Sequence, residues 1–465
     1  MRPFWIEQAL FNDGDLAPAL QGAQRADVCI VGGGFTGLWT AIQAKQRNPA
    51  LDIAILESDL CGSGASGRNG GCLLTWSAKF FTLRRLFGEA EAIRLVKASE
   101  AAVQHIADFC RTHGIDAELR QDGTLYTATS QAQVGTLDPV MKGLEDCGIH
   151  SYRTLPPDEV ARRSGSARNL AGVYSPIAAT VHPGKLVRGL RRVALRMGVR
   201  IYERSPMTDF SAGHPTVVRT PGGTLEAPKL VLAMNAWMAG ALPQFERSIA
   251  IVSSDMVITE KCPELLRATG LTDGVSVLDS RTFVYYYRTT ADGRLMLGKG
   301  GNTFAWGGRI APVFDQRSPY EADLKRALDD FFPSLRHVPV TASWNGPSDR
   351  SVTGFPFFGK LDGAPHIYYG FGYSGNGVGP TYMGGQILSS LLLDEDNAWT
   401  RSPLLQGPLG LFPPEPIRYI GSIVVRDAIR RKEAAEDRDT RPWMVDRLLS
   451  KFANAAGKAD KADKA

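Results

Sequence analysis

The sequence lacks the long apolar runs and the dense basic segments that mark several classes of protein. Residues 1–20 contain no apolar run of the about 7–15 residues that a signal peptide needs. No stretch approaches the about 18 consecutive apolar residues that predict a membrane-spanning helix. The net charge is only +5, without a concentrated basic block in the body of the chain. We therefore expect neither secretion, nor a transmembrane segment, nor binding of nucleic acid.

The cysteines are few and scattered, and none forms a C-x-x-C pair or a cluster with histidine. Such spacing favours neither a structural zinc site nor a disulfide framework, and no other metal site is indicated. Unpaired cysteines are typical of a reducing compartment, so the sequence predicts a cytoplasmic protein. The six cysteines are Cys29, Cys61, Cys72, Cys110, Cys147 and Cys262.

What the chain does contain is enough apolar material for a large core. Of its 465 residues, 43% are hydrophobic and 22% are charged. This composition suits an α/β enzyme of roughly two or three domains.

The most informative stretch is a βαβ pattern near the N-terminus. An apolar strand predicted over 28–31 leads into the turn Gly32-x-Gly34-x-x-Gly37, and a helix is predicted over 35–47. In such a turn the first glycine permits a backbone conformation that a Cβ would forbid. The second lets the backbone approach a pyrophosphate, and the third lets helix and strand pack closely. The pattern predicts a mononucleotide-binding unit whose helix N-terminus faces the phosphates.

An acidic residue completes this unit. A second strand, predicted over 53–56, ends in Glu57, about twenty residues after Gly37. A carboxylate at that position binds the ribose hydroxyl pair and argues against the 2′-phosphate of NADP. The unit by itself leaves FAD and NAD open.

Two further glycine-rich segments favour FAD. Residues 58–72, SDLCGSGASGRNGGC, would let the backbone lie flat along a long extended ligand, which is unusual for an NAD dehydrogenase. A strand predicted over 366–372 enters YSGNGVG at 373–379, which opens a helix over 381–393. A flavin needs this second helix N-terminus, because positive dipole stabilises the electron-rich N1 and O2 of the reduced ring.

Taken together, GGGFTG with Glu57, GASGRNGG and GFGYSGNGVG resemble the D-amino acid oxidase superfamily of FAD-dependent enzymes, which includes sarcosine and glycine oxidases. The resemblance covers roughly residues 25–395. The intact GASGRNGG points to the γ-glutamylputrescine oxidoreductase-like branch. Within it, the segments LTWSAKFFTLRRLFGEAEAIRLVKASE and ASWNGPSDRSVTGFPFFG most resemble the aminophosphonate oxidoreductases.

The resemblance implies an α/β fold: a Rossmann-like FAD-binding domain of the glutathione-reductase type, with an inserted antiparallel-sheet substrate domain. The alternating strands predicted between 248 and 300 suit that insertion. The predicted boundaries are 25–85, 155–240 and 340–395 for the FAD-binding domain, 86–154 and 241–339 for the substrate domain, and 396–465 for a C-terminal extension with a disordered end.

By motif match, the resemblance also implies which residues hold the cofactor. Those at the pyrophosphate and ribose side and along the second loop are Gly32, Gly34, Phe35, Thr36, Gly37, Glu57, Ser58, Gly64, Ala65, Ser66, Arg68, Asn69, Gly70 and Gly71. Met207 would contact the adenine side, and Gly375, Asn376, Gly377 and Val378 would lie at the pyrimidine side of the flavin ring. The cysteine that links flavin covalently in some relatives has no counterpart near 351–359, so noncovalent FAD is expected.

The implied reaction is oxidation of a CH–NH or CH–NH₂ group by hydride transfer to flavin N5, giving an imine and then an aldehyde plus ammonia or an amine. The leading substrate is an aminophosphonate such as 2-aminoethylphosphonate or an N-alkyl derivative; γ-glutamylputrescine-like amines and small amino acids are the alternatives. A phosphonate needs cationic or N–H donors. Candidates for the substrate pocket are Tyr286, Arg288, Lys299, Trp306, Arg309 and Arg350.

One departure from the superfamily concerns the electron acceptor. Sarcosine oxidases use a lysine near the flavin to activate oxygen, whereas RLMLGKG here puts Met296 at that place and displaces Lys299. Oxygen and another acceptor therefore both stay open. Two other functional classes also stay open: an NAD-linked dehydrogenase, which would leave GASGRNGG and GYSGNGVG unexplained, and a flavoprotein without turnover.

Charged segments outside these motifs are interpreted as solvated surfaces. A helix predicted over 183–197 is rich in arginine, and we expect its arginines to face water, together with Arg200. Basic helices are predicted over 423–435 and 443–452, for which a peripheral membrane role is an alternative. The final segment, AGKADKADKA, is low-complexity and predicts disorder.

Overall fold

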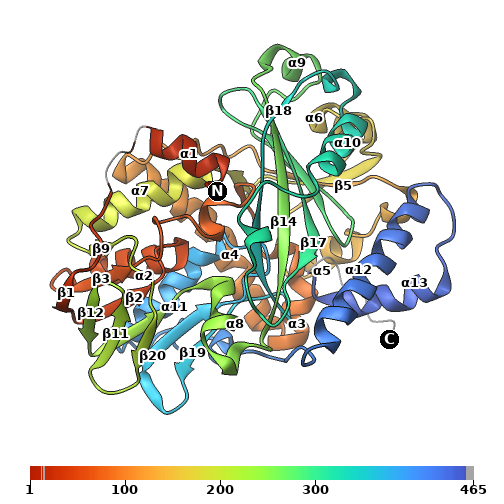
Figure 1. Cartoon of the computed structure of the whole chain (residues 1–465). Helices are drawn as coiled ribbons and strands as arrows, with labels where there is room; N and C mark the ends of the chain where they lie inside the picture. The colour runs from red at the N-terminus through yellow and green to blue at the C-terminus, as the bar shows by residue number, and fades with distance from the viewer. Residues whose placement is uncertain (12, 14–15, 457–465) are drawn as a thin grey trace.

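A six-stranded, mostly parallel sheet carries the N-terminal glycine motif at its centre (Figure 1). The computed structural model describes residues 1–11, 13 and 16–456. The strand order is β19-β20-β13-β2-β3-β9, in which only β19 and β20 pair antiparallel. These strands are β2 (Val28–Val31), β3 (Ile53–Leu56), β9 (Arg200–Tyr202), β13 (Lys229–Leu232), β19 (Phe357–Leu361) and β20 (Ala364–Phe371).

Helices cover one face of this sheet, and a small sheet covers the other (Figure 1). Along β2, Val28 and Ile30 pack into the helical side of the core, while Cys29 and Val31 pack toward the small sheet. This is the period-two alternation of a strand buried on both faces. The helices on the first side are α1 (Phe4–Phe11), α2 (Phe35–Arg47), α4 (Glu89–His113), α7 (Pro183–Arg196) and α11 (Pro380–Leu392). The small sheet contains β1 (Gly22–Arg25), β10 (Asp209–Ser211), β11 (Thr216–Thr220) and β12 (Gly223–Ala227).

A second large sheet has eight strands, in the order β18-β14-β17-β16-β15-β5-β7-β6. Most neighbours pair antiparallel, as predicted for the segment 248–300, whereas β15 and β5 pair parallel. The strands are β5 (Thr124–Ala128), β6 (Arg153–Leu155), β7 (Ala171–Ser175), β14 (Ile249–Thr259), β15 (Ser276–Asp279), β16 (Tyr285–Thr289), β17 (Leu295–Phe304) and β18 (Val340–Ser351). The long β18 thus lies in this sheet and leads directly into β19 of the other, which brings the two sheets together along one continuous segment.

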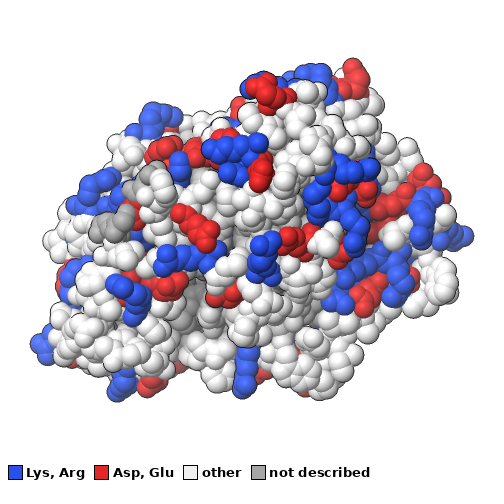
Figure 2. All heavy atoms as spheres, turned by 45° about the horizontal axis from the view of Figure 1, so that its top comes forward, with Lys and Arg blue, Asp and Glu red and all other residues white. Residues whose placement is uncertain are grey.

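The remaining elements are short. Helices α6 (Pro157–Ser164), α9 (Pro263–Ala268) and α10 (Glu321–Phe331) lie near the upper end of the eight-stranded sheet in Figure 1. The others are β4 (Cys72–Leu73), β8 (Ala179–Thr180), α3 (Phe80–Phe87), α5 (Asp138–Glu145) and α8 (Met238–Ala241). On the face shown in Figure 2, cationic and anionic side chains are interleaved and form no continuous field of one sign.

The prediction that the arginines of the helix over 183–197 face water is wrong for two of them. Arg188 and Arg191 on α7 have no exposed surface, and both donate to the buried carboxylate of Glu203. Arg188 also pairs with Asp13 of the N-terminal segment at 2.9 Å. Buried arginines require such partners. Glu203 further accepts the backbone N–H of Cys61 and of Ala17, so this network joins four segments of the chain.

The C-terminal extension folds into two helices, α12 (Ile417–Glu436) and α13 (Met444–Leu449), at the right edge of Figure 1. This confirms the predicted helices, although α12 begins earlier than the pattern indicated. The predicted disorder of the final segment falls almost entirely on residues 457–465, which lie outside the described residues. Among the helices of the described residues, none is sufficiently long and apolar to cross a bilayer.

Candidate cofactor and substrate site

The first glycine turn is shaped by backbone contacts that leave no room for a side chain. Gly32 has φ +114°, and a Cβ there would lie 2.4 Å from the carbonyl oxygen of Ala233. A Cβ at Gly37 would lie 2.0 Å from the carbonyl oxygen of Gly32. At Gly34 the nearest atom is the Ser66 hydroxyl, at 2.9 Å. Glycine is therefore required at 32 and 37 by close packing of β2, α2 and β13.

The N-terminus of α2 opens beside this turn without a side-chain cap. Gly34 occupies the cap position and supplies no side chain, and Ser66 Oγ accepts only the N–H of Phe35, at 2.8 Å. The first turn of a helix carries four N–H groups without intrahelical partners and the positive end of the dipole. The cradle can therefore accept an anionic group such as a pyrophosphate.

Glu57 stands at the carboxyl end of β3, next to the same turn. Its carboxylate accepts the backbone N–H of Gly33 at 2.8 Å and that of Asp59 at 3.0 Å, and the hydroxyl of Ser58 at 3.0 Å. Burial raises the pKa of Glu57, although these three donors oppose the rise. Hydroxyl groups of a ribose would add further donors to this buried carboxylate.

The second loop, residues 64–71, is held in shape by one of its own side chains. The amide of Asn69 donates to the carbonyl oxygens of Ala65 and Ser66, and its oxygen accepts the N–H of Gly71 at 2.8 Å. Arg68 points elsewhere: it donates to the carbonyl oxygen of Ser63 at 2.7 Å and pairs with Asp315 at 2.5 Å. Arg68 therefore ties the loop to the rest of the protein.

Arg288 on β16 binds the backbone at the end of this loop. Its guanidinium donates to the carbonyl oxygens of Gly70 and Val181, each at 2.7 Å, and to that of Thr289. The side chain is buried and lies over the ring of Trp5, with 5.1 Å between the guanidinium carbon and the ring centroid. Burial lowers its pKa to about 10. Because these donors already bind backbone oxygens, Arg288 acts as a positioning residue in this structure.

The C-terminal glycine loop is organised by a carboxylate on β18. Asp349 accepts the backbone N–H groups of three consecutive residues, Gly372, Tyr373 and Ser374. Burial raises the pKa of Asp349 to about 6, against the effect of these N–H donors. The hydroxyl of Tyr373 in turn accepts a hydrogen bond from Thr36 of α2, at 3.0 Å. The two glycine loops, more than 330 residues apart in sequence, are thereby joined.

Two buried polar atoms around this loop have no hydrogen-bond partner in the described part of the chain. They are Ser348 Oγ and Asn376 Oδ1. The Asn376 amide nitrogen donates to the carbonyl oxygen of Thr75, which links this loop to the segment after GRNGG. Unsatisfied buried polar atoms are rare in folded proteins and indicate a missing polar ligand. A flavin pyrimidine ring, which has donors and acceptors along one edge, fits this group of atoms.

The family of this protein is decided by comparison with known proteins. The family of FAD-dependent oxidoreductases named DAO matches residues 27–391. The chain belongs to the DAO family. It is therefore an FAD-dependent oxidoreductase of the kind that acts on amines and amino acids.

Several members are similar over most of their length. The γ-glutamylputrescine oxidoreductase of Escherichia coli is 30% identical over 370 residues, covering 79% of this chain and 83% of that protein. The glycine oxidase of Geobacillus kaustophilus is 26% identical over 391 residues, covering 82% and 96%. A crystal structure of glycine oxidase from that organism superposes with a TM-score of 0.67 over 82% of this chain and 98% of the other. These matches confirm the predicted fold class.

Arg288→Ala is expected to lower the free energy of unfolding by about 2–4 kcal/mol, because buried carbonyl oxygens of Gly70 and Val181 lose their donor. The flavin content of the purified protein should fall with it, since Gly70 belongs to the second DAO loop. Urea unfolding and flavin absorbance per chain measure both effects, and Arg309→Ala, which removes an exposed arginine, is the control. Unchanged stability with a raised KM for anionic substrates would instead assign the guanidinium to substrate binding.

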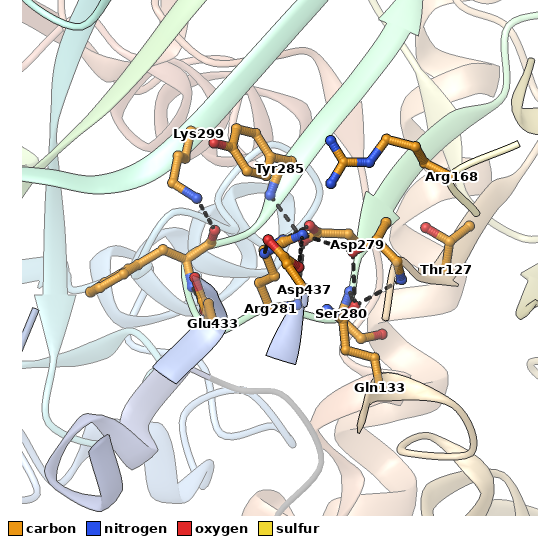
Figure 3. Close-up of polar contacts among 12 residues, drawn as sticks. Thr127, Gln133, Arg168, Asp279, Ser280, Arg281, Tyr285, Lys299, Glu433 and Asp437 are labelled. Carbon is orange, nitrogen blue, oxygen red and sulfur yellow. Dashed lines mark hydrogen bonds and ion pairs between the residues drawn. The ribbon is translucent and has the colours of Figure 1, made fainter. Parts of the chain in front are cut away.

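Lys299 lies beside Tyr285 (Figure 3), on the face of β17 opposite to that of Met296. Its ammonium donates to the carbonyl oxygen of Phe283 at 3.0 Å and lies 3.7 Å from the ring centroid of Tyr285. Burial lowers its pKa. On the opposite face of the strand, Met296 approaches Gly70. Its terminal methyl carbon lies 3.1 Å from the position that a Cβ on Gly70 would have. That Met296 stands in the place of the lysine of sarcosine oxidases stays a prediction.

The other predicted substrate residues do not gather in one place. Tyr286 packs against Gly70 and bonds to the hydroxyl of Ser254 at 2.8 Å. Trp306 is 53% exposed and contacts Tyr419 of α12, with 5.3 Å between ring centroids. Arg309 is exposed, and Met207 packs on the edge of the core beside the small sheet. Of the predicted anion ligands, Arg350 on β18 is the one near the C-terminal glycine loop. Its backbone forms an isolated antiparallel β-bridge with the backbone of Tyr373.

Sequence reasoning missed residues that prepare these loops. Asp349 and Ser348 lie on β18, which has no glycine motif, and their roles depend on contact with residues 372–375. Lys79 was also missed. This lysine follows Thr75, the residue that binds Asn376, by four positions, and its side chain is buried. Its ammonium donates to the carbonyl oxygen of Gly354 at 2.6 Å. The local sequences around these residues, SDRS at 348–351 and WSAK at 76–79, contain no motif that predicts these contacts.

Proposed function

We propose that this protein oxidises the C–N bond of an amine that also carries a phosphonate group, such as 2-aminoethylphosphonate or an N-alkyl derivative. This proposal is carried by a pair of cations, Lys79 and Arg350, beside the C-terminal glycine loop, where Asp349 is the one carboxylate that acts on Arg350. The proposal refines the amine oxidoreductase activity of the DAO family.

We propose that FAD binds noncovalently along the first glycine turn, the second loop at 64–71 and the C-terminal glycine loop at 374–378. Its pyrophosphate would meet the N-terminus of α2, its ribose would bind Glu57, and its ring would meet Asn376 and Ser348. When bound, FAD supplies the chemistry by accepting a hydride from the carbon beside the nitrogen, and hydrolysis of the imine gives the aldehyde. The protein has to bind the amine with that C–H bond facing the ring and hold the rest of the substrate.

The side chains of β18 that face the cofactor loops follow one another at every second residue. A Cβ at Gly346 would lie 2.9 Å from Arg68, and a Cβ at Gly375 would lie 3.5 Å from Ser348 Oγ. Arg350 is the next residue in this series, about 7 Å further along the strand. In this proposal, its guanidinium would reach a small substrate held beside the flavin ring.

The positive charge of Lys79 and Arg350 is only partly offset by the protein. Burial and the nearby charge of Arg350 lower the pKa of Lys79 to about 7. Asp349 is the one carboxylate that acts on Arg350, and its oxygens already accept three backbone N–H groups. Among the described residues, Arg350 has no side-chain hydrogen bond or ion pair. Two partly desolvated cations with a single nearby carboxylate, itself already bound to three backbone N–H groups, favour binding of an anion.

A phosphonate satisfies this pair better than a carboxylate does. It carries up to two negative charges and three oxygens, so it can accept from the planar guanidinium and from the ammonium together. A second candidate substrate is a γ-glutamylputrescine-like amine, which is favoured by the 30% identity to the E. coli enzyme. A small amino acid is a third.

An anaerobic spectrum of the flavin tests the proposal directly. We expect 2-aminoethylphosphonate to bleach the flavin band, and its carboxylate analogue β-alanine and γ-glutamylputrescine to bleach it far more slowly at equal concentration. Admission of air then shows whether oxygen is the electron acceptor. Bleaching by γ-glutamylputrescine alone would retain the amine chemistry and remove the phosphonate from the proposal.

We also propose a cytoplasmic location. All six cysteines are free, as is typical of proteins in a reducing compartment.

A further inference from the structure

The C-terminal extension has its polar side chains turned inward and many of its apolar side chains turned outward. On α12, Arg418 and Glu433 are buried, together with Ala428 and Ile429. Ile417, Ile420 and Val424, spaced as one helical face, are exposed. The first half of α12 therefore exposes an apolar stripe of the kind that a helix on a globular protein normally buries.

Ion pairs and hydrogen bonds hold the extension in this orientation (Figure 3). Asp437 pairs with Arg281 at 2.7 Å, and Glu433 accepts the backbone N–H of Thr282 at 2.9 Å. A second ion pair, Arg431 to Asp446 at 2.7 Å, holds α13 on α12. The outward apolar face is therefore presented by a docked element.

The exposed apolar side chains are densest on α13 and at its two ends. Met444, Val445 and Leu448 lie on one face of the helix, opposite to the buried Asp446. Trp443 before the helix and Phe452 after it are about four-fifths exposed, at 78% and 81%. A contiguous apolar surface of this kind marks an interaction site. We call these five residues, Trp443, Met444, Val445, Leu448 and Phe452, the α13 apolar face.

Cations surround the α13 apolar face. Arg441, Arg447 and Lys451 are exposed, and Arg447 and Lys451 stand three and seven residues after Met444, on the flank of the face. Between residues 438 and 452 the exposed acid is Asp439, because Asp446 is buried against Arg431. A surface that is both apolar and basic complements one that is both apolar and anionic.

We propose that the α13 apolar face docks on the surface of a bilayer that contains anionic lipid. The helix would lie in the interface, with Trp443 and Phe452 inserted and the three cations at the level of the headgroups. A two-fold contact with a second copy of the chain would instead bring Arg447 and Lys451 of both copies against each other. Residues 457–465, GKADKADKA, contain no large apolar side chain.

Vesicle sedimentation with the full-length, FAD-loaded protein tests this inference. The protein should sediment with vesicles of phosphatidylcholine and phosphatidylglycerol, less with phosphatidylcholine alone, and less at high salt. Substitution of serine for Trp443, Met444, Leu448 and Phe452 together should reduce partitioning at least about a hundredfold. Reversal of Arg441, Arg447 and Lys451 to glutamate should abolish the preference for anionic vesicles.

The control replaces two exposed apolar residues outside the extension, Val134→Ser and Leu170→Ser, which should leave sedimentation unchanged. Absence of the wild-type protein from both vesicle pellets would overturn the inference. So would a stable dimer that the four serine substitutions convert to a monomer, since the face would then serve a second copy. Bleaching of the flavin by amine in the same samples reports the proposed reaction separately.

Discussion

Glu203→Gln is expected to lower the free energy of unfolding by about 3–5 kcal/mol, because it leaves two buried arginines without their shared counter-ion. Glu203 has no exposed surface and accepts from Arg188 at 2.7 Å and from Arg191 at 3.1 Å. The same carboxylate accepts the N–H groups of Cys61, which precedes the second loop, and of Ala17 in the N-terminal segment. Flavin content should therefore fall together with stability. Urea unfolding measures the change.

The control for this substitution is Glu226→Gln, which removes an exposed pair with Arg25 and should cost less than about 1 kcal/mol. The pH dependence supplies a second test. Burial alone would raise the pKa of Glu203, but the two N–H donors and the two arginines outweigh it and hold the pKa below its ordinary value of 4.5. This stabilisation is complete above pH 4.5 and is lost as pH falls through the lower, folded value. Stability of Glu203→Gln should decline less over that range, and equal slopes would contradict the assignment.

Arg350→Ala is expected to raise the KM for 2-aminoethylphosphonate by about 10–100-fold, the equivalent of one charge-assisted hydrogen bond. Lys79→Met should have an effect of similar size, and the double variant should lose less than the product, since both cations bind one group. Steady-state kinetics with the phosphonate and with an uncharged amine of equal length measure the effect. The uncharged amine should show little change.

Arg309→Ala is the matched control, because it removes an arginine that is exposed. The pH profile gives a sharper readout. Lys79 is charged below its pKa of about 7 and neutral above it, with Arg350 as the charge that faces it. KM for the phosphonate should therefore rise as pH rises above about 7, and Lys79→Met should remove this rise. An identical profile in both proteins would exclude Lys79 from substrate binding.

The sequence alone was sufficient for the cofactor unit. Strand, turn, helix and acid over 28–57 form a local pattern in which each residue type has a steric or electrostatic reason, and the structure has β2, α2 and β3 at those positions. The second and third glycine segments extended this to FAD for a similar reason. Glycine density in a loop reports a backbone that must come close to something, whatever the rest of the chain does.

Only the tertiary structure decided what the charged side chains do. Arg288, predicted to bind substrate, supports the loop at Gly70, and Arg188 and Arg191, predicted to be solvated, are buried against Glu203. Arg350 gains its proposed role from Lys79, which is far away in sequence. A charge is stable in a buried position only beside partners supplied by remote segments. Local sequence therefore determined the backbone of the cofactor site, and long-range packing determined which charges remain available to a substrate.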